Sequence, residues 1–288
     1  MEILTKVVLQ RFGVIPKKIE REIISIIDEC YERLRPHEVK LIDILLFKDS
    51  SKAGTFYLQE RSTIGIVSDN LDAQFFAMHD AWRGTSRIGI VLDRMEKLPK
   101  LIQAGALRHE VGHSVLHGSF EYYAFSLNKA LISASKQFKL SKGYLVNLLY
   151  LISIAVKDYE VSRLLLKKGF VEDQVAYSKH ILKTSEDDLV AWKISKDYPS
   201  MMVLALAGRL KDTASFIALQ SKLSKTEIID SLRKELSYLP SSILDDILKI
   251  VKRFPEKMSE DTSKNVDLMM KIFVEDLLKP IYEGKYKK

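Results

Sequence analysis

The residues best suited to chemistry in this sequence lie between His109 and Gly118, where the chain contains the pattern His-Glu-x-x-His. His109 and His113 are four positions apart, so on a helix their imidazoles are offset by about 40° and by about 6 Å along the axis. Both rings can therefore reach one metal ion. Glu110 lies on the flank of that face, where its carboxylate can hold a water molecule next to the ion. This combination predicts a catalytic zinc site.

A helix from about residue 99 to residue 117 has to position these side chains. Pro99 suits the start of a helix, and Gly118 suits the position just after its end. An apolar stripe lies roughly opposite the two histidines and comprises Ala104, Leu107, Val111 and Val115. We therefore expect one side of the helix to be buried in a core and the histidines to face the other way. Gly105 and Gly112 lie seven positions apart on one flank, where another element can approach closely.

Catalytic zinc binds three protein ligands and keeps one position open, so the histidine pair needs a third ligand. On a straight helix, His117 would lie about 12 Å along the axis from His109, and one ion is not easily reached from both ends of that span. We therefore interpret His117 as a neighbour of the metal rather than as a ligand.

The preferred third ligand is Glu160, which lies in the segment 156–165. Apolar residues share the side of Glu160 at helical spacing, and a buried carboxylate on such a stripe needs a partner, which a metal would supply. A pair between Glu160 and Arg163 on a helix surface is the alternative interpretation. Asp158 lies in the same segment and is the second candidate for the ligand.

The composition is that of a globular protein, with 47% hydrophobic and 29% charged residues. The net charge is +7, but the positive residues are dispersed apart from a short lysine tail, so we do not expect nucleic-acid binding. The single cysteine, Cys30, excludes an internal disulfide and fits a cytoplasmic location. The N-terminus shows no signal-peptide pattern. The most apolar stretch, 143–156, is shorter than the roughly 20 residues that span a membrane.

The predicted fold class is α+β, with a small antiparallel sheet beside the motif helix and a mostly helical region after residue 120. Nine of the 12 glycines precede residue 144, which indicates strands and turns in the first part only. The expected elements are a helix over 16–34, strands over 40–47, 55–58 and 63–67, a hairpin of 73–82 with 87–93, and about seven helices after residue 120. We place one domain at 1–185 and a helical region at 186–288, which is either separate or part of the same domain.

Residues 109–118 and 156–165 together resemble the gluzincin metallopeptidases, in which an antiparallel sheet, a His-Glu-x-x-His helix and a glutamate helix surround one zinc ion. The motif stretch is especially similar to that of the cytoplasmic gluzincins that cleave repressors and of the archaeal minigluzincins. The metzincin pattern requires a glycine and a histidine where this chain has Leu116 and Ser119, so that class is disfavoured.

The resemblance implies a zinc-dependent peptidase that hydrolyses a peptide or protein substrate. His109, His113 and Glu160 would bind the zinc, and Glu110 would be the general base. In such enzymes the strand before the active helix receives the substrate as an added strand, and here this is 73–82.

The chain departs from the thermolysin-like pattern in one respect. The interval between the second histidine and Glu160 is longer, and must hold at least one extra helix around 124–137. The group that would stabilise the oxyanion is not assigned. Tyr177, His180 and Arg163 are candidates, and a structural role is preferred for each.

Two other functions remain as hypotheses. The chain can be a catalytically silent metal-binding regulatory or scaffold protein whose helical half binds another macromolecule, because fold does not fix function. Glu110 argues against this, since a purely metal-holding protein does not need that carboxylate. A nucleic-acid-binding protein would show steep salt dependence and no metal requirement. The sequence does not indicate an oligomeric state.

Overall fold

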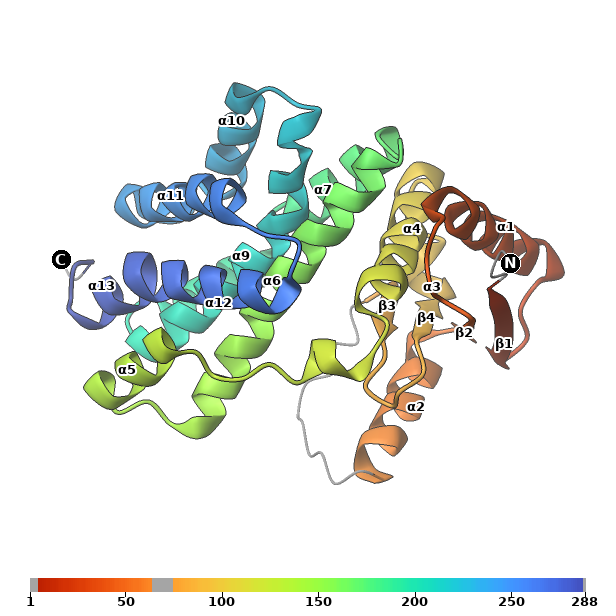
Figure 1. The fold of residues 1–288 in the computed structure, drawn as a ribbon, viewed down its shortest axis with the longest axis horizontal. Helices are drawn as coiled ribbons and strands as arrows, with labels where there is room; N and C mark the ends of the chain where they lie inside the picture. The colour runs from red at the N-terminus through yellow and green to blue at the C-terminus, as the bar shows by residue number, and fades with distance from the viewer. Residues whose placement is uncertain (1–4, 64–74, 287–288) are drawn as a thin grey trace. The chain divides into compact units, whose positions relative to one another are not determined.

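The computed structural model describes residues 5–63 and 75–286 (Figure 1). Contacts divide the chain into two compact units, one formed by Met1–Tyr123 with Leu164–Tyr177 and the other by Ala124–Arg163 with Ser178–Lys288. The helix α6 (Lys142–Lys167) belongs to the second unit up to Arg163 and to the first unit in its last turn. The chain returns to the first unit at Leu164–Tyr177, and the domain division at residue 185 stays a prediction.

The first unit contains a four-stranded mixed sheet with the strand order β1-β2-β4-β3. The strands are β1 (Lys6–Phe12), β2 (Leu41–Phe47), β3 (Ala77–Asp80) and β4 (Arg87–Val91). β1 pairs parallel to β2, and β2 pairs parallel to β4, whereas β3 and β4 are antiparallel. The predicted hairpin is confirmed over these residues. The prediction of a mainly antiparallel sheet is wrong.

Two helical crossovers explain the parallel pairings. Parallel neighbours need a long connection. The helix α1 (Lys17–Leu34) connects β1 to β2, and α2 (Ser50–Thr63) follows β2. The strand predicted at 55–58 is therefore wrong, because these residues lie in α2, whose Ala53 and Tyr57 pack on the sheet one helical turn apart. Most of the strand predicted at 63–67 lies outside the described residues.

The predicted helix over 16–34 is confirmed as α1. Its buried side chains recur at helical spacing and are Ile23, Ile27, Cys30, Tyr31 and Leu34. Cys30 is a free cysteine with no exposed surface, and burial raises the pKa of its thiol. This cysteine is therefore a structural residue of the core.

The motif helix is α4 (Lys100–His117), which follows the short helix α3 (Leu92–Met95). Pro99 occupies the N-cap position and Gly118 the C-cap position, as the sequence predicts. α4 packs against α1, β3 and β4. Two hydrogen bonds in series link α4 to α1. The hydroxyl of Tyr31 in α1 lies 2.6 Å from the hydroxyl of Ser114, and the Ser114 hydroxyl donates to the carbonyl of Val111. Because the Ser114 proton is used there, Tyr31 is the donor to Ser114.

Gly105 allows α7 (Glu172–Leu182) to approach α4. A Cβ at this position would lie 2.5 Å from the carbonyl oxygen of Asp173 and 2.8 Å from Cβ of Tyr177. Gln174 of α7 also donates a hydrogen bond of 2.9 Å to the Gly105 carbonyl. The predicted close approach therefore occurs at this glycine, and the approaching element is α7.

We expect Gly105→Ala to destabilise the protein, because the added methyl group cannot fit without moving the α7 backbone. Overpacking of this kind costs about 1–3 kcal/mol. Gly143→Ala is the matched control, since a Cβ there meets nothing within 4 Å and alanine is the better helix former. Urea denaturation of both variants measures the difference. Equal stabilities would show that α7 does not need this close approach.

All regular secondary structure among the described residues of the second unit is helical. Besides most of α6, this unit holds α5 (Lys129–Phe138), the end of α7, α8 (Glu186–Ser195), α9 (Pro199–Ile217), α10 (Lys225–Glu235), α11 (Ser241–Lys257), α12 (Thr262–Phe273) and α13 (Lys279–Tyr282). A short 3-10 turn lies at Ala218–Ser221 and a π-turn at Val274–Leu278, whereas the 3-10 turn at Phe120–Tyr123 belongs to the first unit. The helical prediction after residue 120 is thus confirmed for the described part of the chain. α5 occupies the place of the extra helix expected around 124–137.

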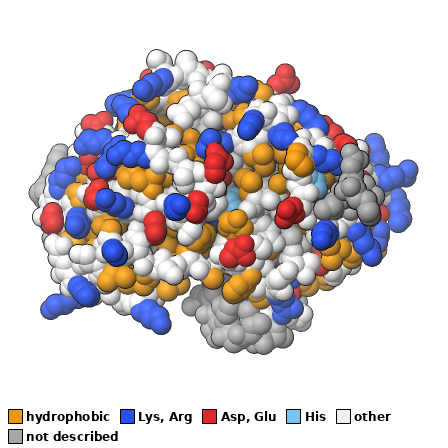
Figure 2. All heavy atoms as spheres, in the orientation of Figure 1, with side chains coloured by type: hydrophobic (Ala, Val, Ile, Leu, Met, Phe, Trp, Pro, Cys, Tyr) orange, Lys and Arg blue, Asp and Glu red, His pale blue; other side chains and the backbone are white. Residues whose placement is uncertain are grey.

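Helix starts and apolar stripes explain this bundle. Ser185 and Asp188 form a reciprocal capping box at the start of α8, and Ser224 caps α10. α9, α11 and α12 each contribute a fully buried phenylalanine to the core, namely Phe216, Phe254 and Phe273. No helix within the described residues is long and apolar enough to cross a membrane. Positive and negative side chains are interspersed on the face drawn in Figure 2, as the dispersed charges of the sequence predict.

Candidate metal centre

Three histidines of α4 lie in a row, one helical turn apart, with His113 in the middle. Nε2 of His113 lies 3.2 Å from Nε2 of His109, and Nδ1 of His113 lies 3.3 Å from Nδ1 of His117. All three side chains are buried. The side of α4 that carries the histidines is therefore buried as well as the side that carries Leu107 and Val111.

The histidine pair fits a zinc ion. Two Zn–N bonds of about 2.0–2.1 Å at a tetrahedral angle place the two nitrogens about 3.3 Å apart. The observed Nε2–Nε2 separation of 3.2 Å between His109 and His113 matches this value. A histidine that binds a metal normally engages its second ring nitrogen in a hydrogen bond, and His113 makes that contact with His117. His117 thus lies next to His113, and its role at a metal site stays a prediction.

Glu110 is held by the edge strand of the sheet. Its Oε2 accepts a hydrogen bond of 2.8 Å from the backbone N–H of His79 in β3. Val91 donates its N–H to the carbonyl of Phe76, so alternate residues of β3 face β4, and the N–H of His79 points to the outer edge. Glu110 is only 7% exposed. The carboxylate is therefore fixed beside the two histidines by a backbone group.

The side chain of His79 belongs to the same cluster. Its Nε2 lies 2.6 Å from Oγ of Ser86, and its Nδ1 lies 3.3 Å from the hydroxyl of Tyr123. The His79 ring is almost parallel to that of His113, with centroids 5.9 Å apart. Sequence reasoning missed both His79 and Tyr123. The signal was the outward-facing position of His79 in the strand that precedes the motif helix.

The three candidates for the oxyanion-stabilising group lie in different surroundings. Tyr177 of α7 is close to the histidines, with its ring centroid 5.1 Å from that of His109. Arg163 of α6 lies 2.8 Å from the sulfur of Met258, within the second unit. His180 also belongs to the second unit, and burial lowers its pKa. Of these three residues, Tyr177 is therefore the one that contacts a histidine of α4 within the first unit.

Glu160 makes hydrogen bonds to α12. Oε2 accepts from Oγ1 of Thr262 at 2.8 Å, and Oε1 accepts from Nδ2 of Asn265 at 2.6 Å. Both carboxylate oxygens are thus bonded within the second unit. This contact is not the pair with Arg163 that the sequence offers as the alternative.

Asp158 points differently from Glu160, because residues two positions apart on a helix are about 200° apart around its axis. Asp158 lies six residues before the last turn of α6, the part of this unbroken helix that belongs to the first unit. One ligand atom from each of His109, His113 and Asp158 lies within 4.8 Å of the others. Among the described residues, these three side chains form the group that can hold a metal ion.

A buried ionic network lies next to His79 along β3. Arg87 donates from Nε and Nη2 to Oδ1 of Asp80, at 3.0 and 2.8 Å, and makes two further bonds to Glu60 of α2. Oδ2 of Asp80 is buried without a hydrogen-bond partner among the described residues. Burial, opposed by Arg87, raises the pKa of Asp80 to about 6.

We expect the buried carboxyl of Asp80 to make stability depend on pH. Its pKa is about 3.9 in the unfolded chain and about 6 in the folded protein, so the unfolded state releases the proton first as pH rises. The favourable contribution of Asp80 to the free energy of unfolding is at most about 3 kcal/mol. It is complete below about pH 4 and is lost by about pH 6. Urea denaturation of the wild type and of Asp80→Asn across this window isolates the effect. Identical pH profiles would show that Asp80 ionises normally.

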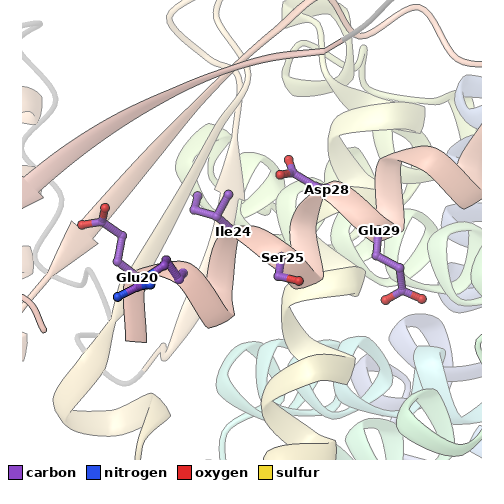
Figure 3. Close-up of a pocket in the computed structure, with 6 residues that line it drawn as sticks. Glu20, Ile24, Ser25, Asp28 and Glu29 are labelled. Carbon is purple, nitrogen blue, oxygen red and sulfur yellow. The ribbon is translucent and has the colours of Figure 1, made fainter. Parts of the chain in front are cut away.

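A shallow hollow elsewhere on the first unit contains none of the histidines of the candidate site. It has a volume of about 580 Å³ and is lined along α1 by Glu20, Arg21, Ile24, Ser25, Asp28 and Glu29 (Figure 3). All six residues come from one helix, and none belongs to the histidine cluster. Cavity size therefore does not locate the candidate site, whereas the side-chain chemistry on α4 does.

Comparison with known proteins adds no assignment. No protein family, curated protein or solved structure matches this chain.

Proposed function

We propose that this protein is a zinc-dependent peptidase that hydrolyses peptide bonds. The observation that carries the proposal is the Nε2–Nε2 separation of 3.2 Å between His109 and His113, with Glu110 fixed next to them by the N–H of His79. Imidazole pairs at this spacing suit zinc, and a carboxylate between them suits a general base. A protein that only stores a metal has no need for a carboxylate held in that position.

We propose Asp158 as the third ligand in place of Glu160. The hydrogen bonds from Thr262 and Asn265 engage both oxygens of Glu160, so metal binding would require breaking them. Asp158 lies on another side of α6, and its carboxylate is within 4.8 Å of ligand atoms of both histidines. An Asp side chain is an ordinary oxygen ligand of zinc, so the set of two imidazoles and one carboxylate is retained.

The chemistry assigned to Glu110 is proton transfer. A zinc ion bound by His109, His113 and Asp158 would supply a water molecule of lowered pKa and would polarise the substrate carbonyl. Glu110 would take a proton from the attacking water and deliver it to the leaving amine. The backbone N–H of His79 donates a hydrogen bond to Oε2 of Glu110 and holds the carboxylate in place. This bond also fixes the plane of the carboxylate, so little reorganisation is needed during the reaction.

The substrate is proposed to add to the outer edge of β3. β3 is an edge strand, and its odd-numbered residues direct their backbone groups away from β4. The N–H of His79 is already bonded to Glu110. The backbone N–H and C=O of Ala77 would therefore form the hydrogen bonds to an added strand. An extended peptide bound there would run past Glu110, which is the arrangement that peptide hydrolysis requires.

A peptide-library digest tests this proposal. The zinc-loaded protein is incubated with a mixture of unstructured peptides, and new termini are identified by mass spectrometry. We expect cleavage that 1,10-phenanthroline abolishes and that added zinc restores. Bound zinc without any cleavage, over a wide range of sequences, would favour the metal-binding scaffold function instead.

A further inference from the structure

A small cavity opens in the second unit between α8, α9 and the turn after α10. Its volume is about 210 Å³. The rings of Trp192 and Tyr238 line it and meet edge to face, with centroids 6.5 Å apart. Small residues of α8 and α9, Ala191 and Ala205, line other parts of the wall. The cavity therefore offers mainly an aromatic and apolar surface.

Gly208 keeps this cavity open. It is the tenth residue of the 19-residue helix α9, where glycine costs about 1 kcal/mol relative to alanine. A helical glycine usually allows a neighbouring element to approach, but a Cβ at this position would meet no atom within 4 Å. Gly54 and Gly143 have equally open surroundings but lie near the starts of their helices. A larger side chain at position 208 would therefore take up cavity space.

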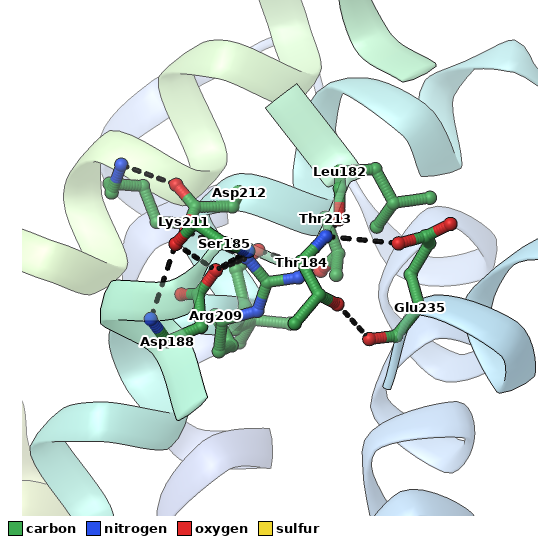
Figure 4. A network of polar contacts seen from close by, with 10 residues as sticks. Leu182, Thr184, Ser185, Asp188, Arg209, Lys211, Asp212, Thr213 and Glu235 are labelled. Carbon is green, nitrogen blue, oxygen red and sulfur yellow. Dashed lines mark hydrogen bonds and ion pairs between the residues drawn. The ribbon is translucent and has the colours of Figure 1, made fainter. Parts of the chain in front are cut away.

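Arg209 also lines the cavity, and Figure 4 shows its guanidinium within a network of polar contacts that includes Asp188 and Asp212. The residue is 6% exposed, and its Nη2 donates to the carbonyl of Leu182 at 2.9 Å. Nη1 lies 3.3 Å from Asp188 and 3.4 Å from Asp212, longer than the roughly 2.7–2.9 Å of a strong charge-assisted bond. Nε has no hydrogen-bond partner among the described residues. A buried N–H without a partner is costly, and an acceptor in the cavity would relieve that cost.

We propose that this cavity binds an aromatic side chain of a peptide segment, with a neutral carbonyl oxygen of that segment accepting a hydrogen bond from Nε of Arg209. The volume lies below the roughly 300–1,000 Å³ of ligand pockets, which suits one side chain rather than a whole metabolite. Asp188 and Asp212 lie beside Arg209, and Lys211 is 2.5 Å from Asp212, so the local charges balance. An anionic ligand would meet two carboxylates and is disfavoured.

The surface of α8 next to the cavity favours a peptide over a free small molecule. Val190 and Ile194 are each 54% exposed and lie one helical turn apart. Ala191, which lines the cavity, lies between them in the sequence. Apolar side chains flanking the aromatic anchor would contact this row, as in other anchored-peptide interfaces. This site is independent of the histidine cluster and does not rest on the proposed peptidase activity.

Isothermal titration of the full chain with N-acetyl-L-tryptophanamide tests the site. We expect weak binding, in about the millimolar range, because the contact is confined to one side chain and one carbonyl. The pentapeptide Ac-Ala-Ala-Trp-Ala-Ala-NH2 should bind at least about fivefold more tightly because of its added contacts. N-acetyl-L-tryptophan, which carries a carboxylate, should bind about tenfold more weakly than the amide.

Gly208→Leu separates binding from folding. Leucine is the better helix former, and its side chain would fill the cavity without a clash at Cβ, so the fold is retained while affinity falls at least about tenfold. Gly143→Leu, which adds the same side chain in open space on α6, should leave binding unchanged. Undiminished binding in Gly208→Leu, or no binding of the amide to the wild type, would overturn the site. A peptide that binds no more tightly than the amide would overturn the peptide assignment.

Discussion

Replacing His113 by alanine should lower the zinc content of the purified protein from about one ion per chain to almost none. His113 lies between His109 and His117, and its Nε2 is 3.2 Å from Nε2 of His109. Its removal leaves two ligands, which rarely hold zinc against buffer. Metal content measured by plasma mass spectrometry after dialysis gives the result directly. His37→Ala is the matched control, because its Nε2 contacts the carbonyl of Tyr31 instead of the cluster. Full zinc occupancy in His113→Ala would remove the histidine pair from the metal site.

The same measurement decides between the two carboxylates of α6. Asp158→Asn should weaken zinc binding, by about 10–100-fold or more, because the amide is a poor ligand. Glu160→Gln should keep the zinc and lower stability by about 1–3 kcal/mol, since it disturbs the bonds to Thr262 and Asn265. Loss of zinc from Glu160→Gln, with zinc retained in Asp158→Asn, would instead support Glu160, the ligand that the sequence favours.

The motif helix could be predicted from sequence because all of its signals are local. Pro99, the apolar residues Leu107 and Val111, and Gly118 lie within one stretch and agree on the same helix. Such signals depend on neighbouring residues, and tertiary contacts do not need to be known.

The sheet was harder to predict because its pairings are not local. β1 was not expected, and β2 pairs parallel to β1 and β4, each of which is separated from it in the sequence by at least one helix. A hairpin has a turn signal between its strands, but a parallel pair separated by a helix has none. The 55–58 segment shows the same limit, since its short apolar run fits a strand or a helix equally well.

The carboxylates of α6 show why part of the candidate site could not be predicted from the sequence. Apolar periodicity indicated that Glu160 faces a core, and the structure gives it polar partners there, namely Thr262 and Asn265 of α12. These partners lie about a hundred residues later in the chain, so no local pattern could reveal them. His79 was missed for the same reason, because its role depends on its register in the edge strand.

Glu110→Gln should abolish most peptide hydrolysis while leaving zinc bound. The amide oxygen can still accept the hydrogen bond from His79, so the position of the side chain is kept. The amide cannot accept a proton, and the loss of a general base lowers kcat by about 10²–10⁴-fold. Rates on a peptide found in the library digest, together with metal content, measure both properties. Glu121→Gln, on the exposed turn after α4, is the matched control.

The two readouts together separate catalysis from metal binding. Loss of hydrolysis with full zinc content assigns proton transfer to Glu110, because the ligands and the contact with the edge strand are unchanged. Loss of both would mean that Glu110 supports the metal site instead, as a carboxylate hydrogen-bonded to β3 could do through the position of α4. Unchanged hydrolysis would exclude Glu110 from the reaction, since a group that moves the proton cannot be replaced by an amide without cost.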